Sequence, residues 1–70
     1  MEEKKWVAIY IKGIYPMSDY SNVVNQECYT REEAVNQLKE WKKTVPSPDF
    51  CYPQIYDKEN DKYEMMLDKI

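Results

Sequence analysis

Aromatic side chains are the part of this sequence best suited to binding chemistry. Ten of the 70 residues are aromatic: seven Tyr, two Trp and one Phe. Trp6 and Tyr10 lie in the apolar run 6–11, and four residues apart in a strand they share one face of a sheet. Such a face can stack nucleobases and can supply the large contacts that dominate protein interfaces. We therefore predict a binding face made of Trp6, Tyr10, Lys12, Tyr52 and Tyr56.

Two interpretations of this aromatic face stay open. A two-layer domain with one uncovered apolar sheet face usually covers that face with a second copy of itself. Alternatively the face binds a different molecule, with Tyr10 stacking a base and Lys12 meeting its phosphate. Both interpretations can hold together, because an oligomer can build a ligand pocket at the seam between its copies.

Three basic residues near the ends of one predicted helix are candidate anion contacts. Arg31, the only arginine, lies where backbone amides at a helix start attract anions. Lys42 and Lys43 lie in the last turn, where they could capture a phosphate or an acidic partner. The alternative is that these lysines are simply solvated and interact with the helix macrodipole.

Catalysis and metal binding are not expected from this chain. The sequence has no histidine, so a triad of the usual kind cannot form. A lone Gly13 makes no phosphate-binding loop, and the spacing of Cys28 and Cys51 fits no zinc motif. We expect a non-enzymatic protein with no cofactor and no metal site. Its cysteines are expected to be reduced thiols, a structural disulfide being the alternative.

The overall charge and the length of the apolar runs limit the partners and the compartment. A net charge of −3 is unfavourable for binding duplex DNA, and it is too weak for a nucleic-acid mimic. The run 6–11 is too short for a signal peptide, and no stretch approaches the length of a membrane span. We expect a cytoplasmic protein that contacts neither duplex DNA nor a membrane.

Five elements must position these side chains. Strands are predicted over 6–11, 23–29, 50–56 and 63–67 from their β-branched and aromatic content. The segment 17–22 is polar and turn-prone. A helix is predicted over 31–44, because Thr30 and Glu33 form a capping box and Pro46 stops the chain from continuing. In that box the Glu33 carboxylate should accept from the amide of Thr30.

The order ββαββ predicts one α+β domain spanning residues 1–70. We expect two layers, a four-stranded antiparallel sheet with one helix packed on one face. Pro53 is expected at an edge or a bulge, which leaves the register of the third strand open. The predicted core consists of Val7, Ile9, Ile11, Ala34, Val35, Leu38, Trp41 and Ile55, with Trp6 and Tyr10 on the opposite, uncovered sheet face.

Three stretches of the chain resemble small ββαββ accessory proteins encoded by bacteriophages and other mobile elements. These stretches read WVAIYIKG, TREEAVNQLKEW and YPQIYDKENDKYE. The resemblance implies a class rather than an activity, and it assigns no role to any single residue. Many such proteins inhibit a host defence protein, and others sequester a nucleotide signal.

The resemblance and the residues together give three functional hypotheses. The first is an inhibitor that binds a host anti-phage defence protein in the host cytoplasm by protein–protein contact. The second is an oligomeric sponge that sequesters a nucleotide immune signal. The third is a structural or assembly protein. The expected partners are therefore a host protein, a second copy of the chain, or a nucleotide ligand.

Overall fold

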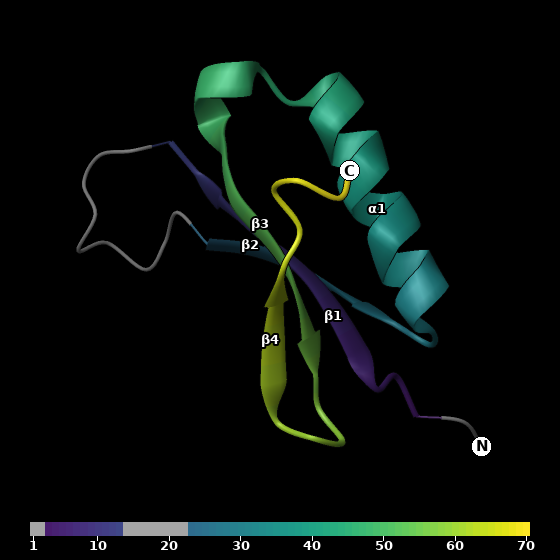
Figure 1. Ribbon diagram of the computed structural model, residues 1–70. Coiled ribbons are helices and arrows are strands. Elements are labelled where there is room, and N and C mark those ends of the chain that lie inside the picture. The colour runs from purple at the N-terminus through teal and green to yellow at the C-terminus, as the bar shows by residue number, and fades with distance from the viewer. Residues whose placement is uncertain (1–2, 14–22) are drawn as a thin grey trace.

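The computed structural model describes residues 3–13 and 23–70 and has an α+β fold (Figure 1). Its elements are β1 (Trp6–Lys12), β2 (Val23–Cys28), α1 (Arg31–Thr44), a short 3-10 helix (Ser47–Asp49), β3 (Phe50–Asp57) and β4 (Lys62–Met65). The predicted fold class and the predicted order of strands and helix are confirmed. The turn expected at 17–22 lies outside the described residues.

The four strands form one antiparallel sheet in the order β2-β1-β3-β4. The central strands β1 and β3 are far apart in sequence, while β2 and β4 form the edges. Helix α1 contacts β1, β2 and β3 and lies on one side of the sheet (Figure 1). No helix in residues 3–13 and 23–70 is long and apolar enough to cross a membrane.

Helix α1 begins at the predicted capping box. The amide of Glu33 donates to the Thr30 hydroxyl at 3.1 Å. The Glu33 carboxylate accepts from the amide of Tyr29 at 2.9 Å, one residue before the predicted Thr30. Both bonds satisfy amides that have no partner within the helix. At the other end the amide of Val45 donates to the Trp41 carbonyl, and Pro46 follows.

The core lies between α1 and the sheet. Ala34 and Leu38, one helical turn apart, are completely buried, as the helical periodicity predicts. They pack with the buried Ala8, Cys28, Ile55 and Met66, and with the partly buried Trp6, Val35, Trp41, Phe50 and Ile70. Cys28 and the half-buried Cys51 are free thiols.

The predicted orientation of β1 is wrong. Ala8 lies in the core, and Tyr10 is only 6 % exposed, with its ring 4.9 Å from that of Trp41 on α1. Because side chains alternate along a strand, Val7, Ile9 and Ile11 lie on the opposite face, away from the helix, although Val7 is buried there. Both faces of β1 are apolar, so alternation alone could not choose between them.

Packing against α1 gives the physical reason for this orientation. Ala8 and Ala34 are both 0 % exposed, and their small side chains let helix and sheet approach closely. The Tyr10 ring fills the wider space further along β1, between Trp41 and Phe50. A row of β-branched residues on that face would present no small position for the helix to approach.

Pro53, predicted to lie at an edge or at a bulge, lies at a bulge in the central strand β3. Ile9 pairs with Gln54 and Ile11 pairs with Cys51, so β3 has one extra residue over that interval. Tyr52 takes a φ of 50° there, and the buried Pro53 needs no ladder hydrogen bond from its own nitrogen. The bulge explains how proline fits into a central strand.

The chain after β4 turns back towards α1 (Figure 1). The amide of Met66 donates to the Pro53 carbonyl at 2.9 Å, and the Met66 side chain is buried. Ile70 packs against the core, and the Lys42 ammonium donates to its backbone oxygen at 2.6 Å. Met65 is the last strand residue, whereas the sequence predicted strand as far as residue 67.

Candidate functional site

The sequence predicted that Trp6, Tyr10 and Lys12 form an exposed binding face. The structure does not leave this face free for binding. Helix α1 covers Tyr10, and Trp6 is half-buried against the core. Lys12 is exposed at the end of β1, opposite Phe50. A base cannot stack on the covered Tyr10 ring, so the nucleotide geometry predicted for Tyr10 and Lys12 is wrong.

The side of the sheet that no described element covers carries a different set of apolar side chains. The cross-strand register places Ile11 beside Val23, and Tyr56 beside Tyr63. Paired residues of neighbouring strands share a face, so residues from all four strands gather on the side away from α1. We call this side the open face; its apolar side chains are Val7, Ile9, Ile11, Val23, Tyr56, Tyr63 and Met65, and the polar Asn25 and Gln54 lie on it beside Ile9.

Two tyrosines form the most prominent part of the open face. The rings of Tyr56 and Tyr63 stack with their centroids 4.5 Å apart, and Tyr63 is 63 % exposed. The Tyr56 hydroxyl donates to the Asp61 carboxylate at 2.5 Å, which raises the pKa of the phenol. That bond ties Tyr56 to the β3–β4 turn, where Asp61 has a φ of 52°.

Of the residues predicted for the aromatic binding face, Tyr56 lies on the open face. Tyr63 was not predicted as a site residue. A signal for it was present, because Tyr63 and Met65 are two residues apart in the last strand and therefore share a face. The sequence assigned Val7, Ile9 and Ile11 to the helix-side core, and they instead lie on this face. Tyr52 lies at the bulge and is half exposed.

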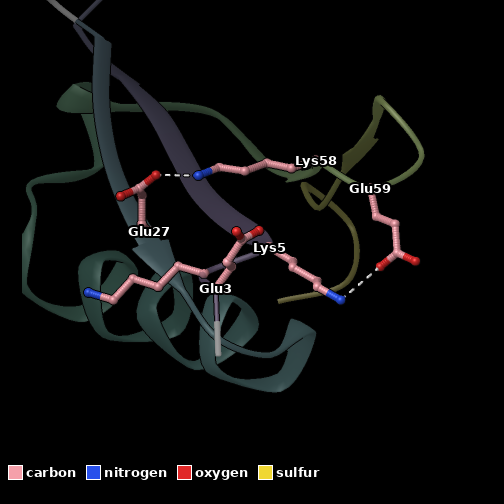
Figure 2. Close-up of a pocket in the computed structure, with 6 residues that line it drawn as sticks. Glu3, Lys5, Glu27, Lys58 and Glu59 are labelled. Carbon is pink, nitrogen blue, oxygen red and sulfur yellow. Dashed lines mark hydrogen bonds and ion pairs between the residues drawn. The ribbon is translucent and has the colours of Figure 1, made fainter. Parts of the chain in front are cut away.

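A charged hollow of about 480 Å³ adjoins one end of the open face (Figure 2). Glu27 pairs across strands with Val7 and therefore shares its face. Residues just before β1 and just after β3 complete the hollow, because the amide of Lys58 donates to the Lys5 carbonyl. The lining residues are Glu3, Lys4, Lys5, Glu27, Lys58 and Glu59.

Ion pairs within this hollow balance its charge. Figure 2 shows the Lys58 ammonium reaching Glu27 and the Lys5 ammonium facing Glu59, the latter at 3.5 Å. The hydrogen bond from Lys58 lowers the pKa of Glu27, so this carboxylate stays ionised at neutral pH. Three acidic and three basic side chains line the hollow, which therefore offers no net charge to an anion.

The three predicted anion contacts do not form one site. Arg31 and Lys42 are separated by eleven residues of α1, which is about 16 Å along the helix axis. The Arg31 guanidinium donates to the Glu64 carboxylate at 2.9 Å and so ties the helix to β4. Lys42 donates to Ile70, and Lys43 is exposed in the last turn.

Among residues 3–13 and 23–70, no group of three Cys, Asp or Glu side chains could hold a metal ion. The open face carries apolar side chains and is bordered by the paired charges of the hollow. This arrangement favours binding through surface contact. Comparisons with protein-family models, with curated proteins and with solved structures found no match to this chain.

Proposed function

We propose that this protein is a non-enzymatic binding protein that acts by protein–protein contact through the open face. The observation that carries the proposal is the sheet side that residues 3–13 and 23–70 leave uncovered, on which every strand contributes an apolar side chain. Apolar side chains from several elements that are exposed on one side of a molecule mark an interaction site.

The composition of the surface supports a protein as its partner. Protein interfaces have an apolar, aromatic-rich centre and a polar rim, and tyrosine is enriched among the residues that dominate their affinity. Stacked Tyr56 and Tyr63, with Met65 beside them, suit the centre. The charged hollow suits the rim, because its balanced charges fit neither a strongly acidic nor a strongly basic partner.

The resemblance to phage-encoded accessory proteins suggests which partner to test first. We propose a host defence protein, inhibited by contact in the host cytoplasm. The open face would also fit a second copy of the chain. The nucleotide-sponge hypothesis loses the site argued for it, because Tyr10 lies under α1.

Two matched charge substitutions test the proposal. Tyr63→Glu places a carboxylate on the open face, and Asn36→Glu places one on the exposed surface of α1. Wild-type protein immobilised on beads should capture a specific host protein, identified by mass spectrometry and then purified for calorimetry. Tyr63→Glu should weaken its binding at least about tenfold, since interface anchors contribute about 2 kcal/mol or more. Asn36→Glu should bind like the wild type.

The opposite pattern would overturn the proposal. If Asn36→Glu weakens binding and Tyr63→Glu does not, the contact surface is the helix. If a cyclic or linear nucleotide binds at micromolar affinity and no protein partner does, the sponge hypothesis replaces it.

A further inference from the structure

The outer edge of β2 carries backbone groups that no neighbouring strand uses. Among residues 3–13 and 23–70, only β1 pairs with β2. The six residues of β2 include no lysine and no proline, two residue types that protect exposed strand edges from further pairing. The other edge strand, β4, has only four residues, and one of them is Lys62. Strand β2 is therefore the longer and less protected edge of the sheet.

The hydrogen-bond pattern of the sheet shows which backbone groups of β2 point outward. The amide of Lys58 donates to the Lys5 carbonyl at 3.0 Å, which makes these residues a hydrogen-bonded pair at one end of the β1–β3 ladder. Successive residues of an antiparallel strand direct their backbone groups to opposite neighbours. Lys5 is directed towards β3, so Ala8, an odd number of residues later, is directed towards its partner Gln26 in β2.

Val23, Asn25 and Glu27 therefore direct their amides and carbonyls away from β1, and we call these backbone groups the free edge. The side-chain amide of Gln26 donates to the Glu27 carbonyl at 3.2 Å, so this carbonyl meets a side chain outside the ladder. A carbonyl oxygen has two lone pairs, and it can accept a second donor. The free edge thus offers the row of donors and acceptors that a further strand requires.

The free edge is complementary to itself about a two-fold axis. An axis through Asn25 places this residue opposite Asn25 of a second copy, and Val23 opposite Glu27 of that copy. All three residues then form hydrogen-bonded pairs, each of which exchanges two bonds, so every group of the free edge is used. An axis through Val24 or Gln26 would leave one of the three residues opposite chain outside β2.

Charge favours the same register. Glu27, the only charged residue of β2, lies opposite Val23 of the second copy rather than opposite another carboxylate. The Lys58 ammonium of its own chain already holds the Glu27 carboxylate, so the approach of a second copy brings no unpaired charge to the contact. The register that pairs the outward groups of β4 is centred on Glu64 and places two carboxylates directly opposite, which is destabilising.

Pairing of the β2 edge with itself also closes the assembly at two copies. Paired residues of neighbouring strands share a face, so both copies of α1 lie on one side of the extended sheet and both open faces on the other. Pairing of β2 with β4 of another copy would be a head-to-tail contact, which builds rings or filaments instead.

We propose that the free edge of β2 pairs with the same edge of a second copy, so that the protein forms a two-fold symmetric dimer with one continuous eight-stranded sheet. This contact lies at the strand edge and not on the open face, so it does not depend on the proposed protein partner.

Hydrogen exchange of backbone amides, followed by nuclear magnetic resonance, tests the proposal at single residues. The amides of Asn25 and Glu27 should exchange several-fold more slowly at high protein concentration than at low, because the dimer protects them. The amides of Tyr63 and Met65, at the outer edge of β4, should exchange at the same rate at both concentrations. A contact made by one strand is small and weak, so the series runs from about 10 µM to about 1 mM.

Two neighbouring lysine substitutions give a matched variant and control, with sedimentation as the measurement. Asn25→Lys places two ammonium groups opposite each other at the axis and should raise the dissociation constant of the dimer at least about tenfold. Gln26→Lys places its ammonium opposite Val24 of the second copy and should leave the dissociation constant unchanged. Both positions are exposed at an edge, so both variants should fold.

A proline substitution tests the hydrogen bonds without adding charge. Asn25→Pro removes the outward amide but no bond to β1, and proline is tolerated in edge strands. It should also raise the dissociation constant at least about tenfold, because each copy loses a hydrogen bond at the axis.

Three results would overturn the proposal. The first is a mass of 8.5 kDa for the wild type at a concentration of about 1 mM. The second is the same dissociation constant for the wild type, Asn25→Lys and Asn25→Pro. The third is a dimer that Tyr63→Glu disrupts and Asn25→Lys does not, because the second copy would then bind the open face.

Discussion

Tyr52 adopts a backbone conformation that tyrosine rarely takes, with a φ of 50° at the bulge of β3. The left-handed region costs a residue with a Cβ roughly 1–2 kcal/mol, whereas glycine enters it freely. The Tyr52 side chain is half exposed, so its own burial does little to offset that cost. The bulge is instead held by the pairing of β1 with β3 on either side and by the Met66–Pro53 bond.

Substitutions at Tyr52 separate this backbone cost from the loss of the ring. Tyr52→Gly should change the free energy of unfolding by less than about 1 kcal/mol, because relief of strain offsets the greater flexibility of glycine in the unfolded chain. Tyr52→Val should be about 1–2 kcal/mol less stable than Tyr52→Gly, since a β-branched residue fits φ > 0 poorly. Urea unfolding of both variants measures the difference. Equal stability would show that the bulge changes shape when the residue changes.

The capping box determines where α1 begins. Thr30→Ala removes the hydroxyl that accepts from the Glu33 amide. We expect a loss of about 1 kcal/mol, which lowers the melting temperature of a domain of this size by about 4–8 °C. Thermal unfolding followed by circular dichroism measures this shift. Thr44→Ala, at the last helical residue, is the control and should have a smaller effect. If Thr30→Ala melts at the same temperature as the wild type, the cap does not contribute to stability.

Glu64 connects three elements through ionic contacts. Its carboxylate accepts from Lys69 at 2.6 Å and from Arg31 at 2.9 Å, so it joins β4 to the following segment and to the start of α1. Hydrogen bonds from Lys69 and from Arg31 lower the pKa of this carboxyl below its ordinary 4.5. A pKa that is lower in the folded protein stabilises the fold above the unfolded value, and that contribution is lost as the pH falls through the folded value.

This linkage predicts the effect of acid on a variant. Between about pH 6 and about pH 3, Glu64→Gln should lose less unfolding free energy than the wild type, because its amide cannot be protonated in that range. Glu40→Gln, an exposed change on α1, should follow the wild-type profile more closely. Urea unfolding at several pH values provides the comparison. If the unfolding free energies of wild type and Glu64→Gln fall in parallel as the pH is lowered, the contacts of Glu64 are too solvated to contribute to stability.

At the scale of the whole molecule, the two sides of one sheet have different roles. The helix side stabilises the fold through Ala8, Tyr10 and Ile55. The open face leaves Tyr63 and Met65 exposed, although its more central Ile9 and Ile11 are partly buried. Substitutions on the helix side should therefore lower the stability of the fold. Substitutions on the open face should weaken association and change the stability little.

A pair of tyrosine substitutions tests this division. Tyr10→Glu should unfold the protein, because loss of a buried aromatic side chain costs about 3–5 kcal/mol and a buried charge adds to that cost. Tyr63→Glu should leave the melting temperature within a few degrees of the wild type. If the open face also binds a second copy, sedimentation at micromolar concentration should show a mass above 8.5 kDa for the wild type, reduced by Tyr63→Glu. A folded Tyr10→Glu variant would contradict the assignment of the faces.

The sequence by itself determined the elements and the fold class of this protein. Helix α1 lies at Arg31–Thr44 because of local hydrogen bonding and sterics. Its first turn is capped by Thr30 and Glu33, and Pro46 prevents it from continuing. The strands follow from their β-branched and aromatic content. Pro53 limited its own position to an edge or a bulge, because proline lacks an amide hydrogen. These signals depend on near neighbours, which can be read directly from the chain.

Only the tertiary structure decided which side of the sheet α1 covers. In β1 both alternating sets of side chains are apolar, and the choice depends on Ala8 meeting the small Ala34, a residue distant in sequence. That choice buries Tyr10 and exposes Tyr63, so it also decided which aromatic residues could form a binding surface. The hollow lined by Lys42, Pro53 and Ile70 has the same origin, since these residues meet only when the chain after β4 folds back against α1.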